Sequence, residues 1–168
     1  MPVQFRMTSW SQAARQALYS GAAASLFSAA VLVLCGKLEN DSAAGPMNGP
    51  SQWVHGRWAA HIREPSFRHT VIGFAIHHVM ATGWALLHEK IFGNRKGTQP
   101  FGRRLGAAAV TGATANFVDY KMTPKRLQPG FETQLSRRSL FLVYAAFAAG
   151  LTLYVGAATR RGKTRRSG

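Results

Sequence analysis

The sequence predicts an all-α membrane protein with four transmembrane helices and an interfacial amphipathic helix between the first two. Three observations support this fold class. The apolar residues gather in four runs, and nearly all the charged residues lie between or beyond these runs. The charge is strongly one-sided, with 21 Lys and Arg against six Asp and Glu, and the basic residues flank the apolar runs as membrane anchors do. The length of 168 residues suits one domain, 1–168.

The first predicted span covers residues 17–36, which contain no charged side chain. At the helical rise of ~1.5 Å per residue this run is about 30 Å long, the thickness of the hydrocarbon core. Gly21, Ser25 and Ala29 recur every four residues and form a stripe of small side chains. Such stripes let helix backbones approach closely in lipid. We therefore expect this face to pack against another helix.

The second predicted span covers residues 67–92 and carries two adjacent histidines, His77 and His78, near its centre. Small residues lie four before, four after and eight after His77, on the same face: Gly73, Ala81 and Ala85. His77 is therefore expected to face another helix, where one hydrogen bond would satisfy it. Candidate partners include the serines of the first span, Ser20, Ser25 and Ser28.

The remaining predicted spans cover residues 105–118 and 140–158. The third is short and weakly apolar, so it can cross only if neighbouring helices shield it or the membrane thins around it. The fourth is long and apolar, and it leads into a basic tail over 159–168. We expect this tail to face anionic lipid.

Between the first two spans, the segment 51–64 predicts a helix lying in the headgroup region. Val54, Trp58 and Ile62 recur every four residues beside Trp53, which gives an apolar stripe with tryptophans. Pro65 is expected to end this helix.

The distribution of Lys and Arg predicts the orientation. With four spans, the side that holds both termini carries twelve basic residues and the other side carries nine. This excess favours cytoplasmic termini. The placement of the charge at span ends, without interleaved aromatic residues on a folded face, argues against nucleic-acid binding.

The histidines of the second span cannot form a metal site by themselves. His77 and His88 are eleven residues apart, so they share a face but lie about 16 Å apart along the axis. His78 and Glu89 have the same spacing on the neighbouring face. We predict no metal and no cofactor. Haem stays an alternative that needs a second axial ligand from a loop, a methionine or a second subunit.

The candidate polar site consists of the ionisable residues in or near the spans: His77, His78, His88, Glu89 and Asp119. Two interpretations stay open, a polar clamp between helices and a working site for protons or a ligand. Asp119 ends the third span, where the helix dipole disfavours an anion. We therefore expect an ion pair between Asp119 and Arg126 that folds the following loop back.

Four stretches resemble a family of small, uncharacterised bacterial inner-membrane proteins: "GPMNGPSQW", "HTVIGFAIHHVMATGWALLHEK", "VDYKMTPKRLQPGFETQLS" and "SLFLVYAAFAAGL". The resemblance extends over Ala44 to Leu151, and its most specific part is the segment 119–136. It implies a multi-span protein of the bacterial inner membrane. It implies no reaction.

Three functions follow as hypotheses. The first is a non-enzymatic accessory or assembly component that packs against itself, as a homo-oligomer, or within a larger membrane complex. The second is a small transporter or proton relay that uses His77, His78, Glu89 and Asp119. The third is a haem- or quinone-binding redox subunit. The sequence offers no nucleophile–base pair, metal box or phosphate-binding loop, which argues against an enzyme. A soluble protein stays an alternative because the mean hydropathy is −0.08.

Overall fold

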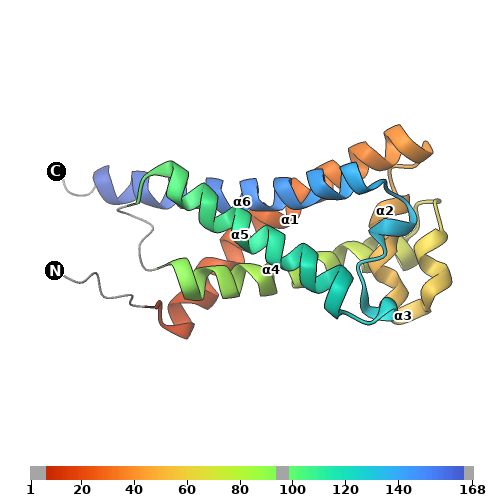
Figure 1. The fold of residues 1–168 in the computed structure, drawn as a ribbon, viewed down its shortest axis with the longest axis horizontal. Helices are drawn as coiled ribbons and strands as arrows, with labels where there is room; N and C mark the ends of the chain where they lie inside the picture. Colours follow the sequence, from red (N-terminus) through yellow and green to blue (C-terminus); the bar gives the residue numbers. More distant parts are fainter. Residues whose placement is uncertain (1–6, 94–98, 165–168) are drawn as a thin grey trace.

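The protein is an elongated bundle of four long helices with a cap of short helical segments at one end (Figure 1). The structure is a computed structural model that describes residues 7–93 and 99–164, with side chains described up to residue 153. The long helices are α1 (Trp10–Asn40), α4 (Ile72–Phe92), α5 (Phe101–Phe117) and α6 (Arg137–Thr164). A π-helical turn, η3 (Phe67–Val71), leads directly into α4. The predicted all-α class is confirmed.

Two of the helices are long and apolar enough to cross a membrane, Trp10–Asn40 and Phe67–Phe92. Each contains a predicted span, 17–36 and 67–92. The other two predicted spans, 105–118 and 140–158, fall on α5 and α6, and their crossing of a membrane stays a prediction. The helix α6 takes in part of the basic tail as far as residue 164, but the tail's side chains lie outside the described residues.

Hydroxyl and carboxylate side chains set where the long helices begin. Ser9 caps α1 by accepting a hydrogen bond from the backbone N–H of Gln12, and Ser66 accepts one from the N–H of His69 at the start of the η3–α4 unit. At α6, Ser136 caps the helix by accepting from the backbone N–H of Ser139 at 3.3 Å, and a second helix supports this cap. The carboxylate of Glu39, at the end of α1, accepts from the backbone N–H of Ser136 at 2.7 Å. The first turn of α6 is thereby tied to the last turn of α1.

The interior of the bundle is built from small side chains that permit close backbone contacts. A Cβ atom added to Gly21 of α1 would lie 2.7 Å from Cα of Thr82 on α4. One added to Gly150 of α6 would lie 2.5 Å from Cα of Ala24 on α1. Ser25 and Ala29 of the predicted stripe are also buried. Within the chain, this face of α1 therefore lies against other parts of the protein.

The small-residue stripe of α4 packs against two different neighbours. Ala81 and Ala85 are buried in the bundle core. Gly73 instead faces the cap, because a Cβ atom there would lie 2.1 Å from the carbonyl oxygen of Met47.

The segment 51–64 is not the continuous helix that its apolar period predicts. It forms α3 (Gln52–His55) and a 3-10 segment η2 (Arg57–His61), separated by Gly56 with φ = +90°. A left-handed backbone at this glycine breaks the helix and turns the chain. Two further short elements precede it, α2 (Gly45–Asn48) and η1 (Gly49–Ser51).

These short elements join the loop between α5 and α6 to form the cap, which we define as residues 42–66 and 118–136. The second part contains η5 (Val118–Met122), η6 (Lys125–Leu127) and η7 (Phe131–Thr133). Side-chain amides and hydroxyls link the two parts, since Gln52 donates to the carbonyl of Gln128 and Thr133 donates to that of Ala60. Gly49 and Gly130 touch through their backbones, so neither site has room for a Cβ atom. The segments 42–66 and 118–136 are far apart in the sequence, and they pack together as one unit in the structure.

Candidate functional site

A cavity lies between α4, α5 and the cap, with α6 at its back. Its volume is about 520 Å³, a size typical of small-molecule sites. Apolar side chains dominate its lining, and the polar ones come from three helices: Ser28, His77 and Tyr144, with Asp119 and Thr123 of the cap. The remaining lining residues are Pro50, Trp53, Ile76, Met80, Ala81, Gly83, Trp84, Leu87, Ala115, Val118, Leu127, Pro129, Phe131, Val143 and Phe147.

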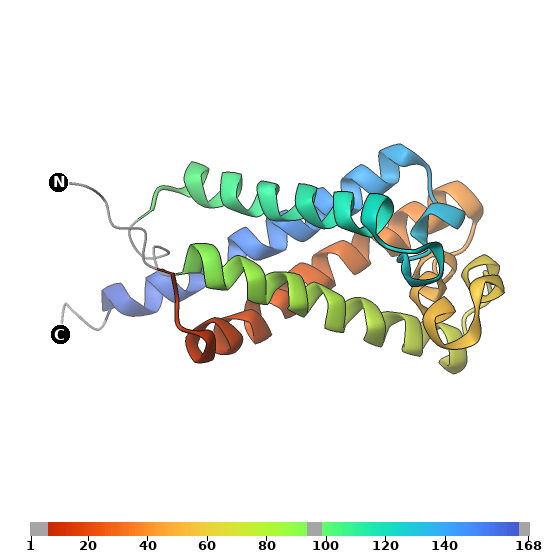
Figure 2. The ribbon, with the colours of Figure 1, turned by 60° about the horizontal axis from the view of Figure 1, so that its bottom comes forward.

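The pocket exists because α4 and α5 do not pack closely together. Both lie on the same side of the bundle (Figure 2), but α4 packs mainly on α1, and α5 packs on α6. On α5 the close contact is to α6, where a Cβ atom added to Gly112 would lie 3.1 Å from the carbonyl oxygen of Tyr144. The lining residues Ala81, Gly83 and Ala115 are small, so they leave space between α4 and α5.

His77 is held against α1 by hydrogen bonds from a single ring nitrogen. Its Nε2 lies 3.0 Å from the hydroxyl oxygen of Ser28 and 3.4 Å from the carbonyl oxygen of Ser25. A carbonyl can only accept, so this geometry assigns the proton to Nε2. The edge of the ring also meets Phe131 of the cap, at 5.7 Å between centroids. The predicted interhelical partner of His77 is thus found among the expected serines.

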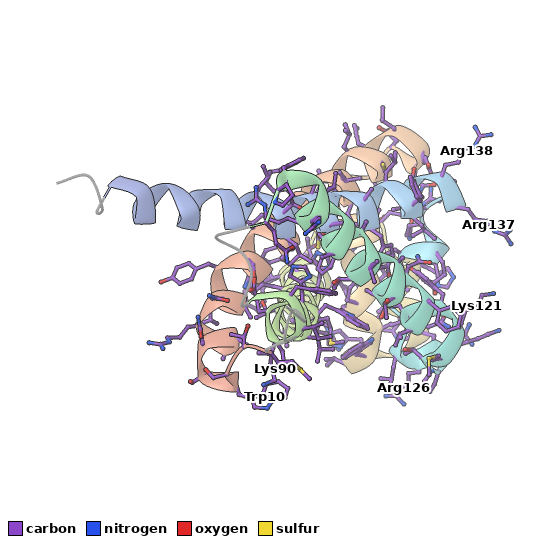
Figure 3. All side chains as sticks on the ribbon, turned by 60° about the vertical axis from the view of Figure 1, so that its left-hand side comes forward. Trp10, Lys90, Lys121, Arg126, Arg137 and Arg138 are labelled. Atoms are coloured by element: carbon purple, nitrogen blue, oxygen red, sulfur yellow. The ribbon has the colours of Figure 1, made fainter. Side chains whose placement is uncertain are left out.

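Asp119 pairs with a tyrosine instead of the predicted arginine. Its Oδ2 accepts a hydrogen bond from the hydroxyl of Tyr144 at 2.7 Å. Arg126 is exposed on the cap and points outward (Figure 3), and in the described part of the chain no ion pair joins it to Asp119. The expected Asp119–Arg126 pair is therefore wrong, because the turn at η5 directs Asp119 into the pocket while η6 lies on the surface.

The electrostatics around Asp119 raise the pKa of its carboxyl group. Burial raises the pKa of Asp119, the hydrogen bond from Tyr144 opposes this rise, and the nearby negative charge of Glu132 adds to it. The ring of Tyr120 lies edge-on to that of Tyr144, at 6.2 Å between centroids. Burial also raises the pKa of the Tyr120 phenol above its usual value.

The other predicted site residues do not join His77 and Asp119. His78 lies against Phe74, with ring centroids 5.9 Å apart, and does not line the pocket. At the opposite end of the bundle, Nδ1 of His88 lies 2.8 Å from the hydroxyl of Thr111 on α5. Glu89 is fully buried at that same end. The five candidate residues therefore fall into three environments: the pocket with His77 and Asp119, the surroundings of His78, and the far end of the bundle with His88 and Glu89.

The end of the bundle near Glu89 is closed by the start of the chain. The backbone N–H of Thr8 donates to the carbonyl of Lys90, and the Lys90 ammonium lies 4.7 Å from the ring centre of Trp10 (Figure 3). Side-chain oxygens of Thr8, Gln16 and Glu89 gather around Gly93. Thr8 and Glu89 are both buried in this corner.

Most of the residues that line the pocket could not be identified from the sequence. Tyr144, Trp53 and Phe131 come from three separate segments, and only folding brings them together. One signal was present in the sequence: Met80 and Trp84 follow His77 by three and seven residues and so share its helix face. Among the residues with described side chains, no group of three or more His, Cys, Asp or Glu is placed to hold a metal ion.

Comparison of this chain with protein-family models, with curated proteins and with solved structures finds no match. The family resemblance of segment 119–136 therefore stays a prediction. Function has to be argued from the chemistry of the pocket itself.

Proposed function

We propose that this protein is a four-span integral membrane protein that binds a lipid-soluble small molecule in the pocket between α4 and α5. The observation that carries the proposal is the pocket of about 520 Å³, apolar over most of its lining and containing His77 and the Asp119–Tyr144 pair. An apolar cavity with a few convergent polar groups is the usual form of a small-molecule site.

The distribution of side chains across the bundle supports the membrane setting. Buried positions on the long helices include many small or hydroxylated residues, among them Ser20, Ser25, Ser28, Thr111 and Thr152. Large apolar side chains lie on the outer surface of all four long helices instead: Leu18, Leu26, Phe27, Leu34, Val79, Val110, Phe117, Phe141, Leu142 and Leu153. Water would make this exposed apolar surface an aggregation hazard, whereas lipid chains would solvate it.

The helix arrangement supports an even number of crossings. The start of α1 and the end of α6 lie at the same end of the bundle, and the cap lies at the other (Figure 1). We propose that both termini face the cytoplasm of a bacterial cell, as the distribution of Lys and Arg favours.

The rival functions have less support from the structure. The small-residue stripe proposed for contacts with partner proteins is used for contacts of α1 with α4 and α6. For a proton relay, His77 and Asp119 do share the pocket. Glu89, however, is some twelve residues along α4 from His77, or about 18 Å at the helical rise. A haem would compete with Ser28 for Nε2 of His77.

Filling the pocket tests the proposal. Gly83 lines it, and a Cβ atom at Gly83 would meet no atom within 4 Å, so a Gly83→Leu side chain fits by occupying pocket space. Gly106 on α5 is equally open but does not line the pocket, so Gly106→Leu is the matched control. The parent and both variants are extracted from membranes in mild detergent, and organic extracts of each are analysed by mass spectrometry.

We expect the protein to be recovered in the membrane pellet. We also expect one lipid-soluble molecule to be enriched in the extracts of the parent and of Gly106→Leu. The same molecule should fall about tenfold or more with Gly83→Leu. Equal amounts in all three preparations would contradict the binding function. Recovery of the chain in the soluble fraction would contradict the membrane setting.

A further inference from the structure

We propose that the pocket selects a neutral lipid-soluble phenol or hydroquinone, with its aromatic ring among the pocket's aromatic side chains and its hydroxyl donating a hydrogen bond to His77 or Asp119. This inference deepens the proposed function and rests on it. Four features of the pocket carry it: its hydrogen-bond acceptors, its largely occupied donors, its lack of cationic side chains and its aromatic walls.

His77 offers the pocket an acceptor. Its Nε2 carries the proton and is directed to α1, to Ser28 and to the carbonyl of Ser25. The neutral imidazole then has its lone pair on Nδ1. No described residue hydrogen-bonds to this Nδ1, and His77 lines the pocket. A ligand hydroxyl is the group that would satisfy it.

Asp119 offers a second acceptor. Tyr144 donates to Oδ2 of its carboxyl group, and Oδ1 has no partner among the described residues. Asp119 also lines the pocket. A hydroxyl at this position would give the half-buried carboxyl group a second hydrogen bond, which is favourable where water is largely excluded.

Three of the polar hydrogens around the pocket are already used within the protein. The hydroxyl of Thr123 donates to the carbonyl of Val118 at 2.9 Å, and that of Ser28 donates to the carbonyl of Ala24 at 2.8 Å. The indole N–H of Trp53 donates to the carbonyl of Gln128 at 3.2 Å. Among the lining side chains, the indole N–H of Trp84 has no acceptor in the described residues, so it is left to donate to a ligand oxygen. A ligand hydroxyl, which both donates and accepts, matches one such donor beside the acceptors of His77 and Asp119.

The charge and shape of the lining further restrict the kind of head group that the pocket can bind. Within the described residues no Lys or Arg lines the pocket, so a phosphate or carboxylate head group would lack a counterion there. Five aromatic side chains do line it: Trp53, Trp84, Phe131, Tyr144 and Phe147. Aromatic rings pack well by offset and edge-to-face contacts, which suits a planar aromatic head group. A cationic amine would have to give up its hydration in this apolar cavity, which costs more than burying a neutral hydroxyl.

A matched pair of probes tests whether the pocket recognises the hydroxyl hydrogen of its ligand. 4-Decylphenol carries an aromatic O–H, and 4-decylanisole replaces that hydrogen with a methyl group at the same position. Binding of each to the full chain in detergent is measured by calorimetry and by the emission of the pocket tryptophans. The double variant Trp10→Phe/Trp58→Phe leaves Trp53 and Trp84, which both line the pocket, as the only tryptophans. Decanoic acid and decylamine serve as anionic and cationic comparators.

We expect saturable binding of 4-decylphenol, with 4-decylanisole, decanoic acid and decylamine each weaker by about tenfold, the effect of leaving a buried acceptor unpaired. His77→Phe and Asp119→Leu each remove an acceptor. At least one of them should lower the preference for the phenol over the anisole, whereas Met80→Leu, an apolar lining change, should preserve it.

The outcomes separate the two proposals. Equal affinities for phenol and anisole would overturn the hydroxyl inference and leave a pocket for apolar molecules. Tighter binding of decylamine or decanoic acid would overturn the inference in favour of a charged head group. Saturable binding of none of the four probes would contradict both this inference and the proposed function. If His77→Phe and Asp119→Leu both keep the preference for the phenol over the anisole, then neither residue recognises the ligand hydroxyl.

Discussion

The hydroxyl oxygen of Ser28 on α1 lies 3.0 Å from Nε2 of His77 on α4. This contact joins the two helices beside the pocket and orients the imidazole so that its other nitrogen is left for a ligand. One hydrogen bond therefore serves packing and site geometry together. The two interpretations of His77, a polar clamp between helices and part of a working site, therefore do not exclude each other.

Removing the Ser28 hydroxyl should weaken the bundle modestly. Hydrogen bonds between membrane helices contribute about 0.6 kcal/mol on average and at most about 1.7 kcal/mol, so we expect Ser28→Ala to lower the free energy of unfolding by an amount in this range. Reversible unfolding in mixed micelles gives this value. The control is Thr114→Ala on α5, because Thr114 is exposed and bonds only its own helix. A loss no larger than that of the control would refute a stabilising role for the contact.

A larger residue at Gly21 should force α1 away from α4. The added Cβ atom would lie 2.7 Å from a backbone atom of Thr82, so a side chain cannot simply rotate away. We expect Gly21→Ala to cost about 1–3 kcal/mol, as overpacking does. Cys35 on α1 is buried and is the only cysteine, so its rate of labelling by a thiol reagent reports helix separation.

The matched control for this prediction is Gly106→Ala, where the added methyl group meets open space. The control should slightly stabilise α5, because alanine favours a helix over glycine by up to about 1 kcal/mol. Equal Cys35 labelling rates in the Gly21 variant and the parent would show that the interface tolerates the methyl group.

Loss of the Glu39 carboxylate should loosen the start of α6. Glu39 accepts hydrogen bonds from the backbone N–H and the hydroxyl of Ser136, and from the hydroxyl of Ser139. We expect Glu39→Ala to cost about 1 kcal/mol, because the hydrogen bonds that tie Ser136 and Ser139 to α1 are lost. Hydrogen exchange of the amides in the first turn of α6 should accelerate. Lys37→Ala is the comparison, since Lys37 forms an exposed pair with Asp41 and its loss should leave α6 unchanged.

The raised pKa of Asp119 should make stability fall as the pH rises. Between the ordinary Asp pKa and the raised folded-state pKa, the folded protein keeps a proton that the unfolded chain has lost. The stabilising contribution is therefore complete below the ordinary Asp pKa and is lost as the pH passes the raised one. Thermal unfolding of the parent and Asp119→Asn, measured in detergent over a pH series, isolates this contribution.

We expect the unfolding temperature of the parent, relative to that of Asp119→Asn, to decrease across this interval and then to level off. The amide of Asn keeps an oxygen that can accept from Tyr144, so the comparison preserves the hydrogen bond. A relative increase with pH would mean that Asp119 is stabilised as a carboxylate in the folded protein.

The helices and their packing faces could be predicted from the sequence because they depend on local pattern. The period of Gly21, Ser25 and Ala29 is a property of one helix, and any close neighbour makes use of it. The prediction of one continuous helix over 51–64 is wrong because a local pattern does not show tertiary contacts. The apolar period of this segment is genuine, but Gly56 permits a left-handed backbone that the cap requires, and tertiary contacts select that conformation.

The partner of Asp119 and the pocket could not be predicted, because they depend on contacts between distant segments. Charge alone made Arg126 the reasonable partner, yet the η5 turn directs Asp119 inward to Tyr144, twenty-five residues further along the chain. The sequence by itself determined an all-helical chain with long apolar helices and the faces along which they pack, since periodicity and length encode these. Only the tertiary structure decided that α4 and α5 diverge around a cavity, and which polar groups line it, because both follow from how the helices and the cap pack together.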